Sequence, residues 1–203
     1  MSGLHINSDF TDYYDSLNDD NSIITYNRFL SDCKQRGTAL KYLRSLGIKT
    51  LELKQVSQYF RDEGPIVVYT DIKAHNSNGK KIMDVADANL YNANCLASKY
   101  YDVKINIKFL QIGKRRLTLT FEKLDSMSLR PGRLIDIKES TSDYNRLVGL
   151  PIFSIDYIPI NNEMVATDFN EVENLARLGI NRYISSNEIV NEIINSLKIY
   201  NKI

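Results

Sequence analysis

Two apolar runs toward the carboxyl end of the chain, residues 152–158 and 164–169, are separated by a short polar segment that contains Asn161-Asn162. Apolar runs of this length are typical of β-strands, and a pair of asparagines between them is typical of a tight turn. The sequence therefore predicts two antiparallel strands joined as a hairpin. This feature constrains the fold most, because it obliges two neighbouring segments to pair within one sheet.

Three side chains with oxygen donors lie within this hairpin. Asp156 interrupts the first apolar run, and Asp168 and Asn170 stand two apart at the end of the second. Residues i and i+2 of a strand point to the same face, so Asp156 can lie opposite the other two. Clustered oxygen donors suit Mg²⁺, which keeps several waters and binds substrate phosphates as well. The alternative is that all three are solvated residues of an edge strand and its turn.

The rest of the chain mixes helical and strand patterns without an internal repeat. Helices are expected at residues 31–46, 56–60, 141–149 and 186–198, another is expected within residues 84–96, and a turn or short helix at 172–178. Strands are expected at residues 22–26, 48–53, 66–70, 103–112, 115–121 and 134–137. Gly47 and Gly179 act as stop signals, and Ser185 or Ser186 is expected to cap the final helix.

Two segments carry cations that could meet an anion. The loop after residue 70 ends in Gly79-Lys80-Lys81, and its backbone N–H and ammonium groups could cover phosphates, although most such loops are simply exposed turns. In the strand at 103–112, Lys104 and Lys108 share one face, and Arg116 could join that face from the next strand. Such a face is either solvated or directed at an anion.

The composition limits the class of protein. A chain of 203 residues with 43% apolar and 25% charged residues can form one domain, or one domain with two lobes. The net charge of +1 gives no global field that favours nucleic acid or an acidic partner. Cys33 and Cys95 have no Cys or His at metal-ligand spacing, which argues against a zinc site and favours a reducing cytoplasm. Neither a membrane-spanning run nor a signal peptide is expected.

The hairpin resembles the ATP-grasp superfamily, in particular its carboxylate–amine ligases of the RimK and graspetide-ligase type. In these enzymes a strand Asp is followed twelve residues later by an acidic residue, then any residue, then Asn. Asp156, Asp168 and Asn170 reproduce this spacing, with Asp168 where the family more often has Glu. Lys108, five residues before Gly113, stands where the family has an Arg that contacts phosphate or substrate.

The resemblance covers roughly residues 31–198 and includes Gly179-Ile180 before the final helix. One departure is that the family's strand lysine has no match after Val68, so Lys73 would have to take its place. The resemblance implies an α+β fold of two small lobes with mainly antiparallel sheets that enclose a nucleotide cleft. The first lobe would span residues 31–100 and the second residues 101–203, after an N-terminal extension at 1–30.

The resemblance also implies an activity, which is the joining of a small-molecule or peptide carboxylate to an amine through an acyl-phosphate, with ATP and Mg²⁺ as cofactors. The expected metal ligands are Asp156, Asp168 and Asn170. The expected nucleotide contacts are Lys34, Lys73, Asn78, Gly79 and Lys80. The expected catalytic residues are Lys108 and Arg116, which would hold the acyl-phosphate or the incoming carboxylate.

Two other functions stay open. The first is a non-catalytic binding or accessory protein with the same fold. Residues 8–15 are similar to the opening of uncharacterised phage proteins, so such a protein would act in the cytoplasm of a phage host. The second is nucleic-acid binding through the cations of the strand pair at 103–121, for which the net charge gives little support. The sequence leaves the oligomeric state open, a homo-oligomer included.

Overall fold

A computed structural model describes residues 36–70, 79–124, 132–140, 152–170 and 178–201, with side chains up to residue 195 in the last segment. The elements of the amino-terminal half are α3 (Arg36–Ser45), β1 (Lys54–Gln55), η1 (Val56–Gln58), β2 (Ile66–Tyr69), β3 (Lys80–Met83), α4 (Val85–Asn92) and β4 (Leu96–Lys99). Those of the carboxyl-terminal half are β5 (Ile105–Ile112), β6 (Arg115–Glu122), β7 (Arg133–Glu139), β8 (Ile152–Ile160), β9 (Glu163–Asn170), η4 (Ile180–Arg182) and α5 (Ser186–Asn201).

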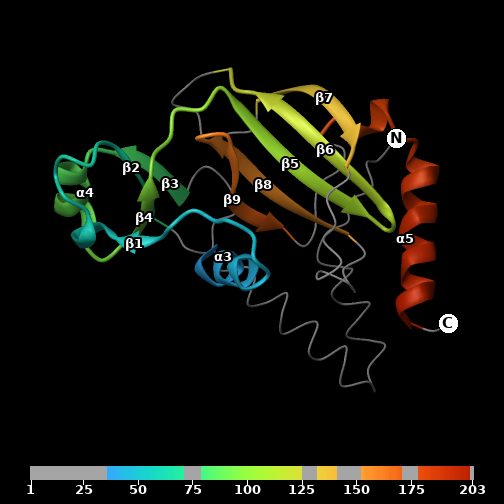
Figure 1. Ribbon diagram of the computed structural model, residues 1–203, viewed down its shortest axis with the longest axis horizontal. Coiled ribbons are helices and arrows are strands. Elements are labelled where there is room, and N and C mark those ends of the chain that lie inside the picture. Colours follow the sequence, from blue (N-terminus) through green and yellow to red (C-terminus); the bar gives the residue numbers. More distant parts are fainter. Residues whose placement is uncertain (1–35, 71–78, 125–131, 141–151, 171–177, 202–203) are drawn as a thin grey trace.

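The described strands form two sheets, which lie side by side along the long axis of the molecule (Figure 1). The smaller sheet has the order β1-β4-β2-β3 and the larger has the order β7-β6-β5-β8-β9. Every pair of neighbouring strands in these two sheets is antiparallel. The expected α+β fold with mainly antiparallel sheets is therefore confirmed.

The smaller sheet is held by a small apolar core of its own. All four residues of β2, Ile-Val-Val-Tyr, are buried, as expected for a central strand rich in β-branched side chains. Ile66 and Val68 pack with Val56 of η1 and with Val85 and Ala88 of α4. This core lies at the left end of Figure 1, away from the larger sheet.

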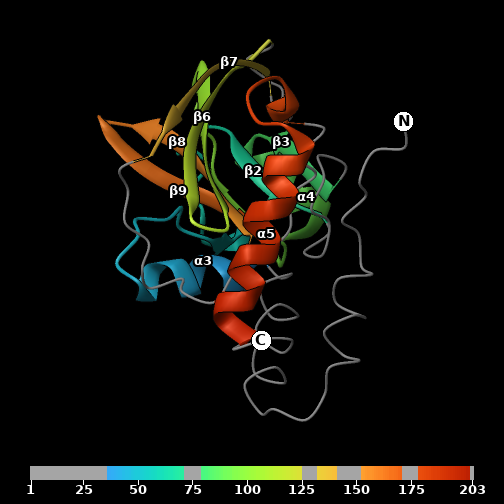
Figure 2. The ribbon, with the colours of Figure 1, turned by 90° about the vertical axis from the view of Figure 1, so that its right-hand side faces the viewer.

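The larger sheet is covered on both faces, by α3 on one and by α5 on the other (Figure 2). The core on the α3 face contains Phe109, Phe153, Ile155 and Phe169 of the sheet with Ala39, Leu40 and Leu43 of the helix. The core on the α5 face contains Leu110, Ile112, Leu117 and Leu119 of the sheet with Ile189 and Ile193 of the helix. This division follows from the strand period of two residues, which sends successive side chains to opposite faces.

The predicted hairpin is present as β8 and β9, with its turn at Asn161-Asn162. The φ angles of these residues are 49° and 62°, a left-handed conformation that asparagine tolerates better than most residues and that two-residue hairpin turns require. A β-bulge then interrupts the pairing. Tyr157 lies opposite Ala166 but Asp156 lies opposite Asp168, so Thr167 is the extra residue.

The structure corrects one predicted element and adds a strand. Residues 48–53 do not form a strand, because their pairing with the larger sheet is limited to an isolated parallel bridge between Thr50 and Ala166. The helix expected within residues 84–96 is present as α4 and ends at Asn92, and residues 96–99 form β4, a strand that the sequence pattern did not predict. Pairing of β4 between β1 and β2 outweighs the weak local preference of the Leu-Ala-Ser-Lys segment.

The position of α3 differs from its place in the predicted lobes. The helix falls within residues 31–100, the range expected for the first lobe, yet it packs on the larger sheet beside β9 (Figure 1). The segments predicted at 1–30 and 141–149, and residues 172–177 of the segment predicted at 172–178, lie outside the described residues. Within the described part of the chain, none of the helices has the length and apolar content needed to cross a membrane.

Candidate functional site

A row of polar side chains crosses three neighbouring strands of the larger sheet, β5, β8 and β9. Cross-strand register places Lys108 of β5 beside Asp156 of β8, and Asp156 beside Asp168 of β9. Lys108 Nζ lies 2.6 Å from Asp156 Oδ1 and donates a hydrogen bond of 3.1 Å to Ser154 Oγ. Asn170 Nδ2 lies 3.4 Å from Asp156 Oδ2. The residues expected at the metal site and Lys108 therefore share one face of the sheet.

Arg36, the first described residue of α3, reaches this row from the edge of the sheet. Its Nη2 donates to Asp168 Oδ2 at 2.8 Å, and its Nη1 donates to the carbonyl oxygen of Thr167, the bulge residue, at 2.6 Å. The residue is only 7% exposed. Burial lowers the pKa of the Arg36 guanidinium, but the Asp168 carboxylate outweighs this effect and the pKa is raised overall.

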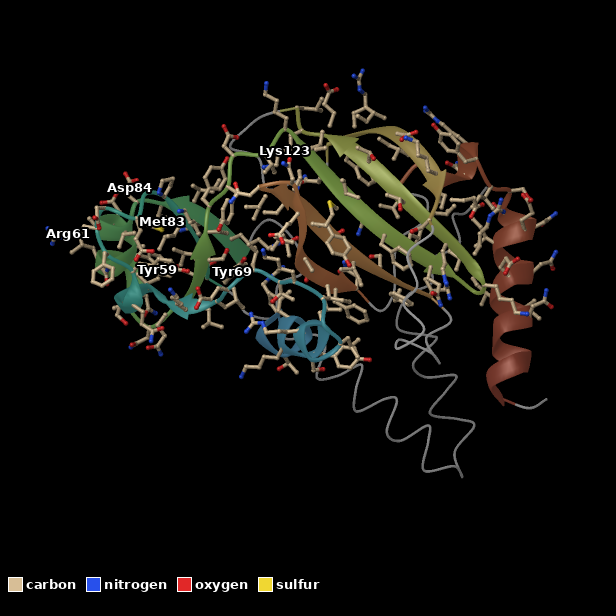
Figure 3. All side chains as sticks on the ribbon, in the orientation of Figure 1. Tyr59, Arg61, Tyr69, Met83, Asp84 and Lys123 are labelled. Carbon is tan, nitrogen blue, oxygen red and sulfur yellow. The ribbon has the colours of Figure 1, made fainter. Side chains whose placement is uncertain are left out.

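Tyr69 supports Arg36 from the smaller sheet. The guanidinium carbon lies 5.0 Å from the centroid of the Tyr69 ring, a distance at which a cation is attracted to the ring face. The Tyr69 hydroxyl is hydrogen-bonded to Ser98 Oγ of β4 at 3.0 Å, and both residues are buried. Figure 3 shows Tyr69 at the end of the smaller sheet that faces the larger one, whereas Met83 and Asp84 lie nearer the far end.

Lys80 is the third cation at this place. It pairs with Tyr69 across β2 and β3, and it interacts electrostatically with Arg36, Asp168 and Asp156. Burial, followed by repulsion from Arg36, lowers the pKa of Lys80 to about 8. Among the residues that the structure describes, the ammonium group of Lys80 has neither a hydrogen-bond nor an ion-pair partner. An ammonium group held this way favours an anionic ligand.

We refer to Arg36, Lys80, Lys108, Asp156 and Asp168 as the charged cluster. Its three cationic groups face two carboxylates, which leaves one positive charge in excess. Each carboxylate oxygen has a partner: Lys108 and Asn170 for Asp156, Arg36 and the Phe169 backbone N–H for Asp168. The cluster joins elements of both sheets and α3.

The donor types on this face fit Mg²⁺. Two carboxylates and one amide oxygen are hard donors, and Asn170 presents its oxygen in place of its nitrogen after a rotation that leaves the side-chain shape unchanged. The described residues contain no group of three or more His, Cys, Asp or Glu side chains able to hold a metal, and this face itself has two acids and one amide. The types of donor atom therefore suit Mg²⁺, but in this structure both carboxylates are paired with protein cations.

The structure does not bring all the predicted site residues together. Arg116 lies opposite Gln111, on the face that carries Phe109 and not on the face of Lys108. Lys108 is 7% exposed, so the solvated alternative is wrong for this residue. Gly79 is buried directly before β3. Lys34, Lys73 and Asn78 lie outside the described residues.

Sequence reasoning did not identify Arg36, Tyr69 or Ser98. A signal for Arg36 is nevertheless present in the helical pattern. Arg36 precedes Ala39, Leu40 and Leu43 at spacings of three, four and seven, so it occupies a position on the buried side of α3. A cation on the apolar side of a helix requires a partner, since burying an isolated charge is costly.

No protein-family model matches the chain, and a search of the curated proteins finds no match either. Solved structures do resemble it. The macrocyclase MdnC of Microcystis aeruginosa MRC, bound with precursor peptide MdnA, matches with a TM-score of 0.58 at 13% identity, over 81% of this chain and 61% of MdnC. The ATP-grasp ligase PsnB matches with a TM-score of 0.57 at 12% identity, over 84% of this chain and 61% of PsnB. The chain has the ATP-grasp fold.

The same ATP-grasp fold is shared with a D-alanine–D-alanine ligase from Bacillus anthracis, with a TM-score of 0.54 at 15% identity. This match covers 84% of the chain and 69% of the ligase. The chain therefore spans between 61% and 69% of these three ATP-grasp ligases. The likeness establishes the fold, and substrates and activity are argued separately below.

Proposed function

We propose that the protein is a Mg-ATP-dependent ligase that joins a carboxylate to an amine. The observation that carries the proposal is the charged cluster, in which three cations from three different elements meet two carboxylates. An excess of positive charge in a poorly solvated place favours a polyanion such as a triphosphate. The ATP-grasp fold supports this ligand, because a solved D-alanine–D-alanine ligase of that fold is complexed with ATP and PsnB with Mg and ADP.

In this proposal the metal is bound by residues of the β8–β9 hairpin. Asp156, Asp168 and Asn170 would hold Mg²⁺, which when bound neutralises charge on the phosphates. These residues would supply only part of the ligands of the ion, since Mg²⁺ keeps waters and substrate oxygens among its ligands. Two carboxylates and one amide on one face of the sheet are enough for the protein's part of such a coordination shell.

The cations of the charged cluster receive the phosphates. Arg36 provides a planar fork of donors, and Lys80 and Lys108 provide compact ammonium groups, so together they can contact oxygens of more than one phosphate. Lys34, Lys73, Asn78 and Gly79 remain predicted nucleotide contacts from the sequence. Arg116 takes no part in the proposal, because it lies on the other face of the sheet.

In this reaction the chain has to orient the substrates and stabilise charge. A carboxylate oxygen of the substrate attacks the γ-phosphorus, the bond to the β-phosphate oxygen breaks, and ADP leaves with that electron pair. The amine then attacks the acyl carbon, inorganic phosphate leaves, and the amine proton passes to solvent. Lys108 stabilises the charge on the transferring phosphoryl group, and orientation supplies much of the remaining rate.

The substrate class remains a proposal of the same kind. MdnC is bound with a precursor peptide and PsnB with a variant of a minimal precursor, whereas the D-alanine–D-alanine ligases act on amino acids. A small-molecule or peptide carboxylate and an amine are therefore the proposed substrates. A non-catalytic binding protein is the second candidate, favoured by the pairing of every carboxylate oxygen with a protein group.

The experiment that separates the two candidates is release of ADP from ATP and Mg²⁺ in mixtures of carboxylates and amines, including amino acids and short peptides. A ligase releases ADP only when both a carboxylate and an amine are present, and Asp156→Asn abolishes the release. Binding of ATP without ADP release in any mixture would support the non-catalytic protein.

A further inference from the structure

The carboxylates of the charged cluster are closed to a free metal ion in this structure. Asp168 Oδ2 is held by Arg36 at 2.8 Å and Asp156 Oδ1 by Lys108 at 2.6 Å, and the second oxygen of each also accepts a hydrogen bond. A cation that binds either carboxylate must first displace a protein cation. That displacement leaves a guanidinium or ammonium group buried without its counterion, which is costly.

The charge of the cluster opposes a free metal for a second reason. The cluster already has one positive charge in excess, and Lys80 is without a carboxylate partner among the described residues. Adding Mg²⁺ alone raises the excess in a poorly solvated place, where like charges repel strongly. A metal that arrives with a polyphosphate adds net negative charge instead.

We propose that Arg36 and Lys108 act as built-in counterions that keep free divalent cations off Asp168 and Asp156, so that metal and polyphosphate bind only as a unit. When both ligands enter, the carboxylates pass to the metal and the two cations pass to phosphate oxygens, so no buried charge loses its partner. This inference rests on the proposed function, because it takes a polyphosphate as the natural ligand.

Arg36 is then a positioning residue, which acts on the metal through Asp168. Removing its charge must make the free carboxylate more available to a cation, an effect that a purely structural arginine would not produce. Because coupling between two ligands is reciprocal, the metal must raise the affinity for polyphosphate by the same factor that polyphosphate raises the affinity for metal.

The test uses Mn²⁺ as the probe, with the unbound ion measured by electron paramagnetic resonance. We expect Arg36→Gln to bind free Mn²⁺ more tightly than the unmodified chain by about 5- to 150-fold, the usual range of coupling between sites. Two variants serve as controls. Lys80→Met also removes one positive charge from the cluster but does not free a carboxylate. Arg44→Gln changes an exposed arginine of α3, the helix that contains Arg36. Arg44→Gln should bind Mn²⁺ as weakly as the unmodified chain, and Lys80→Met should gain clearly less affinity than Arg36→Gln, because it lowers the charge of the cluster but leaves both carboxylates paired.

Three outcomes contradict the proposal. The first is tight binding of free Mn²⁺ by the unmodified chain. The second is an unchanged Mn²⁺ affinity in a folded Arg36→Gln variant. The third is an equal gain in Arg36→Gln and Lys80→Met, which would mean that net charge rather than the Arg36–Asp168 pair controls the metal.

A second measurement needs only the unmodified chain, in case Arg36→Gln does not fold. The melting temperature is recorded with Mn²⁺, with tripolyphosphate, and with both. We expect the two together to raise it by more than the sum of their separate effects. A shift with Mn²⁺ alone as large as with both, or no shift with both, overturns the proposal. If ATP fails where tripolyphosphate succeeds, the counterion exchange stands and the nucleotide assignment falls.

Discussion

Arg36 Nη2 and Asp168 Oδ2 lie 2.8 Å apart, although 132 residues separate them in the sequence. The pair ties the beginning of α3 to the end of β9, and the exposed fractions of the two side chains are 7% and 10%. Its members serve the fold and the proposed site at once. This dual role gives the pair a measurable effect on stability in the absence of any ligand.

We expect Asp168→Ala to lower the free energy of unfolding by about 3–5 kcal/mol, because it leaves the Arg36 guanidinium buried without its counterion. Urea denaturation measures the change. Glu163→Ala is the control, since the Lys49–Glu163 pair is exposed and contributes less than about 1 kcal/mol. Equal losses in the two variants would mean that the Arg36–Asp168 pair does not stabilise the fold.

Lys80 predicts a dependence of stability on pH. Burial lowers its pKa from 10.5 to about 8 in the folded chain, so between these pH values the unfolded chain binds more protons than the folded one. The free energy of unfolding therefore increases as the pH rises across this interval. Below about pH 8 Lys80 is charged in the folded chain, and the full cost of burying that charge lowers the stability.

The matched variants for this effect are Lys80→Met and Lys81→Met. Lys80→Met removes the buried charge, so we expect a more stable chain at pH 7 and a flatter pH profile. Lys81 follows on the same strand, is exposed and lies over the Tyr91 ring, so its variant keeps the slope of the unmodified chain. An unchanged profile in Lys80→Met, measured by urea denaturation at several pH values, contradicts the assignment.

Gly113, in the turn between β5 and β6, lies against Glu192 of α5. Its φ is 58°, and a Cβ added there would lie 2.5 Å from the carbonyl oxygen of Glu192. We expect Gly113→Ala to cost about 1–3 kcal/mol through overpacking, in addition to the backbone strain. Gly64→Ala isolates the strain, because Gly64 has a φ of 80° with no atom within 4 Å of the added Cβ. Similar melting temperatures for both variants would mean that α5 moves away from the added methyl group at little cost.

The hairpin shows how far the sequence determines the site. Apolar alternation and the Asn161-Asn162 pair predict the strands and the turn, both of which are present. Regular pairing from that turn would place Asp156 opposite Thr167 and send Asp168 to the other face. The bulge at Thr167 corrects the register and brings the two acids together. A β-bulge is hard to recognise in a sequence. The meeting of the two acids therefore depends on a feature that the apolar alternation does not predict.

The cationic side of the site was harder to predict. Lys80 and Lys108 were identified from loop and strand positions, and both lie in the charged cluster. Arg36 was not identified, because its partner is distant in the sequence. Arg116 was assigned to the wrong face, since only the register with Gln111 decides where it points. Side chains that meet through tertiary pairing are the ones that a single sequence leaves undetermined.

The nucleic-acid hypothesis loses its basis in the structure. It relied on a stripe of cations along β5 and β6, but Lys108 is buried beside Asp156 and Arg115 is paired with Glu139. Arg116 points away from the Lys108 face. The described cations of these strands therefore do not form a continuous basic surface.

The most direct test of the nucleotide site is titration calorimetry of Mg-ATP into the unmodified chain, Lys108→Met and Lys104→Met. We predict that the unmodified chain binds Mg-ATP, that Lys108→Met loses the binding, and that Lys104→Met, which changes an exposed lysine just before the same strand, retains it. Bound nucleotide should also raise the free energy of unfolding by about 2.7 kcal/mol at a concentration one hundred times the dissociation constant. A folded, unmodified chain that gives neither heat nor stabilisation with Mg-ATP would contradict the proposed function.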